Sequence, residues 1–266
     1  MPITERELLE QYGSAACLGN TALFIGAGLS ISAGYPPWST LLDRSRKQAH
    51  IPSGIKDLPL MAEYIQQTIP GGRDVLEGNI LAMLVAVDRH PTLGHHWLSK
   101  LPIDDVWTTN YDTLLEQVIP EVSVVSSDND LQDHRRLQRR RIIKMHGSLT
   151  VDNPPGWLKS PVITRRDYEE YDIRNPRLWA ALRATYLTKS MLFLGFSFTD
   201  PYIEVLLRLS RTLLNRGAPE HFTILRSPET PEAKRLHDLQ VRDLETSGIA
   251  VCEVADYDAL EPFSGG

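Results

Sequence analysis

The sequence predicts a Rossmann-like α/β fold, in which helices cover both faces of a parallel sheet and a helical insert interrupts the alternation. Three observations predict this fold. Short apolar runs recur along the 266 residues, helical segments separate most of them, and polar or glycine-containing turns follow several of them. Because alternating strands and helices build parallel sheets, we expect a single domain over residues 1–266, with a ligand at the carboxyl edge of the sheet.

The chain opens with an expected helix over residues 4–18. Thr4 is its predicted N-cap, and Glu7 follows three residues later, which is the spacing of a capping box. A short apolar run then stops at a glycine turn, as a buried strand does. The strands expected in order are residues 21–25, 105–108, 122–125, 141–145, 190–194, 221–225 and 249–254.

Helical patterns separate most of these strands. The helices expected between them are residues 38–49, 111–118, 176–188, 200–215 and 230–243. Residues 57–99 are also mostly helical by pattern, but this stretch is long for a simple crossover. We therefore expect a helical insert at about residues 51–100.

Composition and charge exclude several classes of protein. The formal net charge is −6, so no field of the whole protein attracts nucleic acid or an anionic membrane. A local exception is the basic run from Arg135 to Arg141, which is either a solvated surface or a contact for phosphate or a partner. The N-terminus lacks the apolar core of a signal peptide, and no apolar run approaches the length of a membrane span. We expect a soluble cytoplasmic protein.

The two cysteines, Cys17 and Cys252, are far apart in the sequence. Neither belongs to a Cys-x-x-Cys pair, so four thiolates cannot hold a structural zinc ion within this chain. Two lone cysteines also fit a reducing cytosol. We expect no metal site.

The turn after the first strand reads Gly26-Ala27-Gly28-Leu29-Ser30. Glycines there let backbone N–H groups approach a diphosphate closely, and the Ser30 hydroxyl can donate to it. The pattern is neither Gly-x-Gly-x-x-Gly nor a P-loop. The alternative is that the glycines only allow a helix to pack closely on the sheet.

Two further turns carry candidate catalytic side chains. Asn110 and Asp112 follow the strand at residues 105–108 and can converge on one polar ligand, although either could simply cap the next helix. His146 directly follows the strand at residues 141–145, and its pKa range suits a general base. The alternative for this lone histidine is a structural role.

The turn at Gly195-Phe196-Ser197 follows the strand at residues 190–194. Ser197 could meet a phosphate or a ribose. Asp200 is interpreted as a cap for the helix that begins at Pro201, since proline favours the first helical position.

Together, these four motifs resemble the sirtuin family, in particular the zinc-free sirtuin-like domains of bacterial anti-phage defence proteins that hydrolyse NAD⁺. The resemblance implies that the Gly26-Ala27-Gly28 turn and Ser30 hold the NAD⁺ diphosphate. It places Trp38 where sirtuins have a phenylalanine that shields nicotinamide.

The remaining roles follow from the same resemblance. Asn110 and Asp112 would lie at the nicotinamide ribose and carboxamide, His146 would be the catalytic histidine, and Ser197 would contact the adenosine side. Gly195 is also expected to bind the cofactor. Thr109 stands beside Asn110 at a cofactor-binding position, where sirtuins have glutamine.

Departures from the family pattern shape the expected reaction. The four-cysteine zinc module is absent, and the Asp-Phe-Arg expected after the proline is replaced by Pro37-Trp38-Ser39. These changes weaken a deacylase assignment and leave hydrolysis of NAD⁺ to nicotinamide and ADP-ribose. Asn110 would place the water and His146 would accept a proton.

Other functions remain open at this point. One is a non-catalytic module that senses NAD⁺ or ADP-ribose, and another is an ADP-ribosyltransferase or NAD-dependent deacylase. Because an unregulated NAD⁺ hydrolase would harm its host, we expect control by homo-oligomerisation or by a regulatory partner such as an ATPase.

Overall fold

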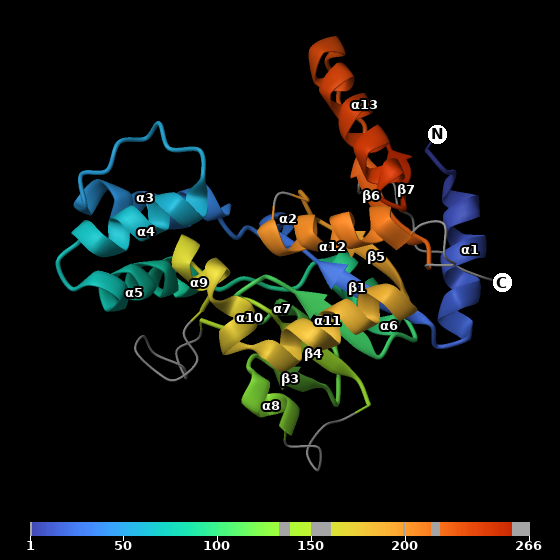
Figure 1. Cartoon of the computed structure of the whole chain (residues 1–266), viewed down its shortest axis with the longest axis horizontal. Helices are drawn as coiled ribbons and strands as arrows, with labels where there is room; N and C mark the ends of the chain where they lie inside the picture. The colour runs from blue at the N-terminus through green and yellow to red at the C-terminus, as the bar shows by residue number, and fades with distance from the viewer. Residues whose placement is uncertain (1, 133–138, 150–160, 199, 214–218, 257–266) are drawn as a thin grey trace.

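A computed structural model describes residues 2–132, 139–149, 161–198, 200–213 and 219–256. A seven-stranded sheet forms the centre, in the order β3-β4-β2-β1-β5-β6-β7 (Figure 1). Every neighbouring pair is parallel, which confirms the α/β prediction. The strands are β1 Thr21–Ile25, β2 Asp105–Thr108, β3 Ser123–Val125, β4 Arg141–Lys144, β5 Ser190–Leu194, β6 His221–Arg226 and β7 Ile249–Val254.

The helices follow most of the predicted segments. They are α1 Glu5–Cys17, α2 Ala27–Ser32, α3 Trp38–Gln48, α4 Leu58–Thr68, α5 Gly72–Val85, α6 Leu93–Lys100, α7 Leu114–Val118, α8 Asp128–Gln132, α9 Arg165–Glu169, α10 Tyr171–Arg174, α11 Pro176–Thr188, α12 Pro201–Leu213 and α13 Pro231–Thr246. The capping box of α1 is confirmed, because the Thr4 N–H donates to Glu7 Oε2 at 2.8 Å and the Glu7 N–H donates to Thr4 Oγ1 at 3.2 Å. In the described part of the chain, no helix combines the length and the apolar character needed to cross a bilayer.

Alternating side chains of the central strand build two cores. Ala22 and Phe24 of β1 face a cluster that includes residues of α11 and α12. Leu23 and Ile25 face the opposite cluster, to which α1, α6 and α7 contribute. All four side chains are fully buried, and burying a large apolar side chain of this kind stabilises a fold by about 1.5–3 kcal/mol. Helices therefore cover both faces of the sheet, as predicted.

Helices α3, α4 and α5 pack on one another to one side of the sheet (Figure 1). Their shared core includes Leu42, Ile65 and Ile80. Helix α6 instead packs on α7 and contributes Leu98 to a core against the sheet. The expected insert at residues 51–100 therefore differs from the observed three-helix cluster, which starts earlier at α3 and ends before α6.

The position of β1 explains where a ligand can bind. From β1 the chain passes to β2 on one side, and it later returns to place β5 on the other side. In open α/β sheets, ligands bind outside the carboxyl ends of the strands at such a change of direction. The turns after β1, β2, β4 and β5 all lie at that edge.

Candidate active site

One large pocket opens at the carboxyl edge of the sheet and collects the motifs singled out in the sequence. Gly26 contributes its carbonyl oxygen just beneath the pocket, as an acceptor for Asn110. The other predicted site residues line it: Ala27, Gly28, Ser30, Trp38, Thr109, Asn110, Asp112, His146, Gly195 and Ser197. The four turns thus meet in space although about 170 residues separate the first from the last.

The glycine turn after β1 contacts the glycine turn after β5. The Gly28 N–H donates to the Gly195 carbonyl at 2.8 Å, and the Gly26 N–H donates to the Leu194 carbonyl at 2.8 Å. A Cβ on Gly26 would lie 2.5 Å from the Gly195 oxygen. Close contact between the two loops therefore requires these glycines, which is the packing role considered for the first turn.

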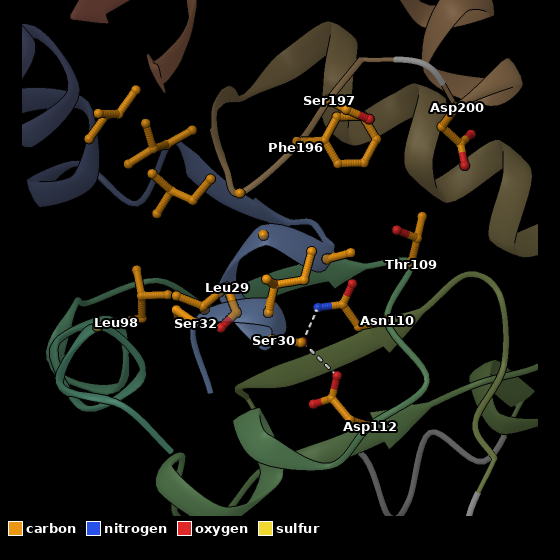
Figure 2. Close-up of a pocket in the computed structure, with 18 of the residues that line it drawn as sticks. Leu29, Ser30, Ser32, Leu98, Thr109, Asn110, Asp112, Phe196, Ser197 and Asp200 are labelled. Carbon is orange, nitrogen blue, oxygen red and sulfur yellow. Dashed lines mark hydrogen bonds between the residues drawn. The ribbon is translucent and has the colours of Figure 1, made fainter. Parts of the chain in front are cut away.

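Three polar side chains form a connected network on the pocket floor (Figure 2). Asn110 Nδ2 donates to the Ser30 hydroxyl at 2.8 Å and to the Gly26 carbonyl at 3.1 Å. The Ser30 hydroxyl in turn donates to Asp112 Oδ2 at 2.6 Å. Both amide hydrogens of Asn110 are thus engaged by the protein, so the Oδ1 acceptor is the atom that the amide can offer to a ligand.

A buried lysine holds the loop that carries Asn110 and Asp112. Lys144 of β4 is fully buried, and its ammonium donates to the Tyr111 carbonyl at 3.2 Å, to Glu116 Oε1 at 2.9 Å and to the Asp112 carbonyl. A buried charge is tolerated when it is paired and hydrogen-bonded in this way. Sequence reasoning missed this role; its only signal was a lysine within an apolar strand.

His146 lies at the end of β4 and is 4% exposed. Its Nε2 lies 3.4 Å from Asp200 Oδ2, and the Tyr168 ring packs edge-on against it at 5.2 Å between centroids. Burial lowers the pKa of the His146 imidazole, and the Asp200 and Asp167 carboxylates partly oppose that shift. The ring is therefore neutral near pH 7 and able to accept a proton.

Asp200 joins this site from the start of α12. Its Oδ1 accepts the Tyr202 N–H at 2.9 Å, which confirms the expected capping role. Its other oxygen faces His146, a contact that the sequence did not indicate. Figure 2 shows Asp200, Phe196 and Ser197 on the same side of the pocket, across from Ser30 and Asp112.

The part of the basic run that the structure describes contacts the protein itself. Arg139 pairs with Asp104 at 3.1 Å, and Arg141 pairs with Asp105. Arg140 donates to the carbonyls of Leu98 and Ser99. Residues 135–138 of the run lie outside the described residues.

Comparison with known proteins places these features in a family. The family model described as "SIR2-like domain" matches residues 104–247. The NAD(+) hydrolase ThsA of Enterococcus faecium is 34% identical over 96% of this chain and 56% of its own length. The NAD(+) hydrolase ThsA of Bacillus cereus is 30% identical over 91% of this chain and 52% of its own length. Defense-associated sirtuin 2 of Bacillus subtilis is 26% identical over 97% of this chain and 26% of its own length. The chain thus spans about half the length of these ThsA relatives.

Proposed function

Because this chain belongs to the SIR2-like domain family, we propose that it is an NAD⁺ hydrolase that depletes NAD⁺ in anti-phage defence. It breaks the bond between nicotinamide and ribose and releases nicotinamide and ADP-ribose. The names of its relatives support this assignment. The observation that carries it is the meeting of Asn110 and His146, from the turns after β2 and β4, in one pocket at the carboxyl edge.

The arrangement of polar groups fits this reaction. The positively charged nicotinamide ring of NAD⁺ leaves the ribose as neutral nicotinamide, so its departure needs no acid, unlike the glycosidic oxygen of ordinary glycosidases. Asn110 Oδ1 accepts a hydrogen bond from the attacking water and so aligns it with the ribose carbon. The neutral His146 takes a proton from that water or from a ribose hydroxyl.

The other lining residues bind the dinucleotide. The turn at Gly26-Ala27-Gly28 lies along the diphosphate, with the Ala27 N–H as a donor, because the Gly26 and Gly28 N–H groups already donate to the Leu194 and Gly195 carbonyls. Ser197, next to Gly195, contacts the adenosine side, and Trp38 and Thr109 enclose nicotinamide. Ser30 is 5% exposed and bonded to both Asn110 and Asp112, which supports a role in positioning Asn110 as well as any contact with the diphosphate.

Asp112 lies at the nicotinamide end of the pocket. Its Oδ1 accepts the Leu114 N–H at 3.0 Å, and its Oδ2 accepts the Ser30 hydroxyl. An ionised carboxylate has about four acceptor positions. It therefore keeps capacity for the N–H groups of the nicotinamide carboxamide.

The test is to incubate the purified protein with NAD⁺ and separate the products by chromatography. Nicotinamide and ADP-ribose should appear with the wild type and be lost in Asn110→Ala and His146→Ala. Nicotinamide together with a modified protein would instead indicate a transferase or a deacylase. Binding of NAD⁺ without any product, both in dilute protein and in protein concentrated enough to self-assemble, would favour a sensing module and contradict a hydrolase that self-assembly controls.

Control of the activity is part of the proposal. An NAD⁺ hydrolase that acts on the cytoplasmic pool would deplete its own host unless it were restrained. We propose that self-assembly, or a regulatory partner such as an ATPase, provides the restraint. Turnover per protomer should then change with protein concentration or with added partner, alongside a change in mass measured by light scattering.

A further inference from the structure

We propose that Asp200 is a positioning residue for His146: its carboxylate orients the imidazole and stabilises the imidazolium formed when the ring takes a proton. The proposal rests on the proposed hydrolase function, in which His146 is the base. It gives Asp200 a second role beyond capping α12.

The two side chains form a buried pair. His146 Nε2 lies 3.4 Å from Asp200 Oδ2, with side-chain exposures of 5% and 11%. Within the described residues, Nε2 has no hydrogen-bond partner. A charge-assisted N–H···O bond is about 2.7–2.9 Å long. A movement of roughly half an ångström therefore closes the pair once the ring carries a charge.

The carboxylate of Asp200 is held in place by its own helix. Oδ1 accepts the Tyr202 N–H at 2.9 Å, and the backbone carbonyl of Asp200 accepts the Glu204 N–H at 3.1 Å. Helix α12 runs for 13 residues, and the positive end of its dipole attracts the negative charge of this carboxylate. With Oδ1 fixed, Oδ2 stays directed at His146.

Two further titratable side chains near His146, those of Tyr168 and Asp167, come from α9. The Tyr168 ring packs against the imidazole in a T-shaped arrangement. The charge of Asp167 is already paired with Arg73 at 2.5 Å, and its Oδ2 accepts the N–H groups of Ile163 and Thr164. In the described part of the chain, Asp200 has no lysine or arginine ion pair. Asp200 is therefore the carboxylate whose charge is left for the histidine.

His146 and Asp200 have successive roles in moving one proton during hydrolysis. As water adds to the ribose carbon, the carbon–nitrogen bond breaks and nicotinamide leaves with the electron pair. One proton of the water passes to the His146 ring, and the Nε2–H of the resulting imidazolium donates to Asp200 Oδ2. Later loss of that proton to solvent restores the neutral ring. This division of work is that of the His–Asp part of a catalytic triad.

The variant Asp200→Asn removes the charge and keeps the cap, because asparagine is as good an N-cap as aspartate. Asp200→Ser also keeps a cap and provides a second test if the asparagine variant folds poorly. A matched control is Asp128→Asn, since Asp128 likewise accepts backbone N–H groups at the start of a helix, those of Arg177 and Leu178 of α11.

We expect both Asp200 variants to lower kcat by about 100-fold or more, in the range for losing general-base assistance. KM should stay within about twofold, because the carboxylate acts through the histidine and not on the substrate. The acid limb of the pH–rate profile should move to lower pH, since removing the negative charge lowers the pKa of His146. Asp128→Asn should leave kcat and the profile unchanged.

A second measurement separates this proposal from the hydrolase assignment. The pKa of His146 is followed by NMR titration of the imidazole, with His146→Ala identifying its signal among the eight histidines. A lower pKa in Asp200→Asn than in the wild type supports the pair even if no NAD⁺ turnover is found. An unchanged pKa, or wild-type kcat in both Asp200 variants while the wild type hydrolyses NAD⁺, overturns the pair and leaves the hydrolase standing.

Discussion

The backbone N–H of Gly28 donates to the carbonyl of Gly195 at 2.8 Å, which joins the turns after β1 and β5. These strands are neighbours at the point where the chain changes direction across the sheet. A Cβ on Gly28 would lie 2.7 Å from the Gly195 Cα, and a Cβ on Gly195 would lie 2.6 Å from the Leu29 nitrogen. The two glycines therefore set how closely the walls of the pocket approach at its base.

We expect Gly195→Ala to destabilise the fold by about 2–4 kcal/mol, from overpacking combined with backbone strain. Gly195 has a φ of +63°, which disfavours alanine, and the clash is with backbone atoms that cannot rotate away. Urea unfolding measures the change. The control is Gly13→Ala in α1, where nothing lies within 4 Å of the added Cβ. Equal stability of the two variants would contradict the contact.

Ser30→Ala tests the network below the pocket. The substitution removes the acceptor of one Asn110 amide hydrogen and the donor to Asp112. We expect kcat for NAD⁺ to fall by about 10- to 100-fold, because small misplacement of a reacting group is costly. Ser14→Ala is the comparison, since Ser14 is exposed and its hydroxyl bonds to the Glu10 carbonyl within α1. Unchanged kcat in Ser30→Ala would show that Asn110 is held without Ser30.

Lys144→Met should destabilise the protein by about 3–5 kcal/mol, the usual cost of leaving one half of a buried ion pair. The substitution removes the hydrogen-bond donor of the Glu116 carboxylate and of the Tyr111 and Asp112 carbonyls. Glu116→Gln should lower the free energy of unfolding less in the Lys144→Met variant than in the wild type. A double-mutant cycle should give a coupling energy of about 1–3 kcal/mol between the two residues. Additive losses would mean that the ion pair contributes little.

Much of the fold was predictable because it depends on local patterns. Each strand is a short apolar run, and parallel pairing brings the ends of β1, β2, β4 and β5 to one edge. That geometry also predicted which turns meet. Helix α2 was missed because its six residues, Ala27–Ser32, carry glycine and serine and no helical periodicity. The expected helix at residues 111–118 begins only at Leu114, since hydrogen bonds to Lys144 and Ser30 hold the preceding loop.

The contacts that refine the site could not be read from spacing. Asp200 and His146 are 54 residues apart, and Ser30 and Asp112 are 82 apart. Each residue has an adequate local explanation, as a helix cap or as part of a turn. The contacts of these pairs depend on tertiary packing. The spacing of residues along the chain does not reveal which side of a turn a side chain faces.

His221 gives the fold a defined pH dependence. It is 1% exposed at the start of β6, and its Nδ1 accepts the Met191 N–H at 3.2 Å, so the neutral ring is the form that fits. Burial lowers the pKa of this imidazole from 6.5 to about 3. Below pH 6.5 the His221 ring takes up a proton in the unfolded chain but stays neutral in the folded protein. The contribution of the neutral ring to the free energy of unfolding is therefore complete above pH 6.5 and is lost as the pH falls toward 3.

We therefore expect the free energy of unfolding to fall between pH 6.5 and pH 5, with His221 contributing up to about 1.4 kcal/mol per pH unit. His221→Asn removes the titrating ring and keeps a polar side chain of similar reach. Urea unfolding at several pH values compares the slopes. At pH 8 the variant should have a lower free energy of unfolding than the wild type. Its free energy of unfolding should fall less steeply than that of the wild type as the pH is lowered. Parallel curves would assign the acid sensitivity to other groups and place the folded-state pKa of His221 near its ordinary value.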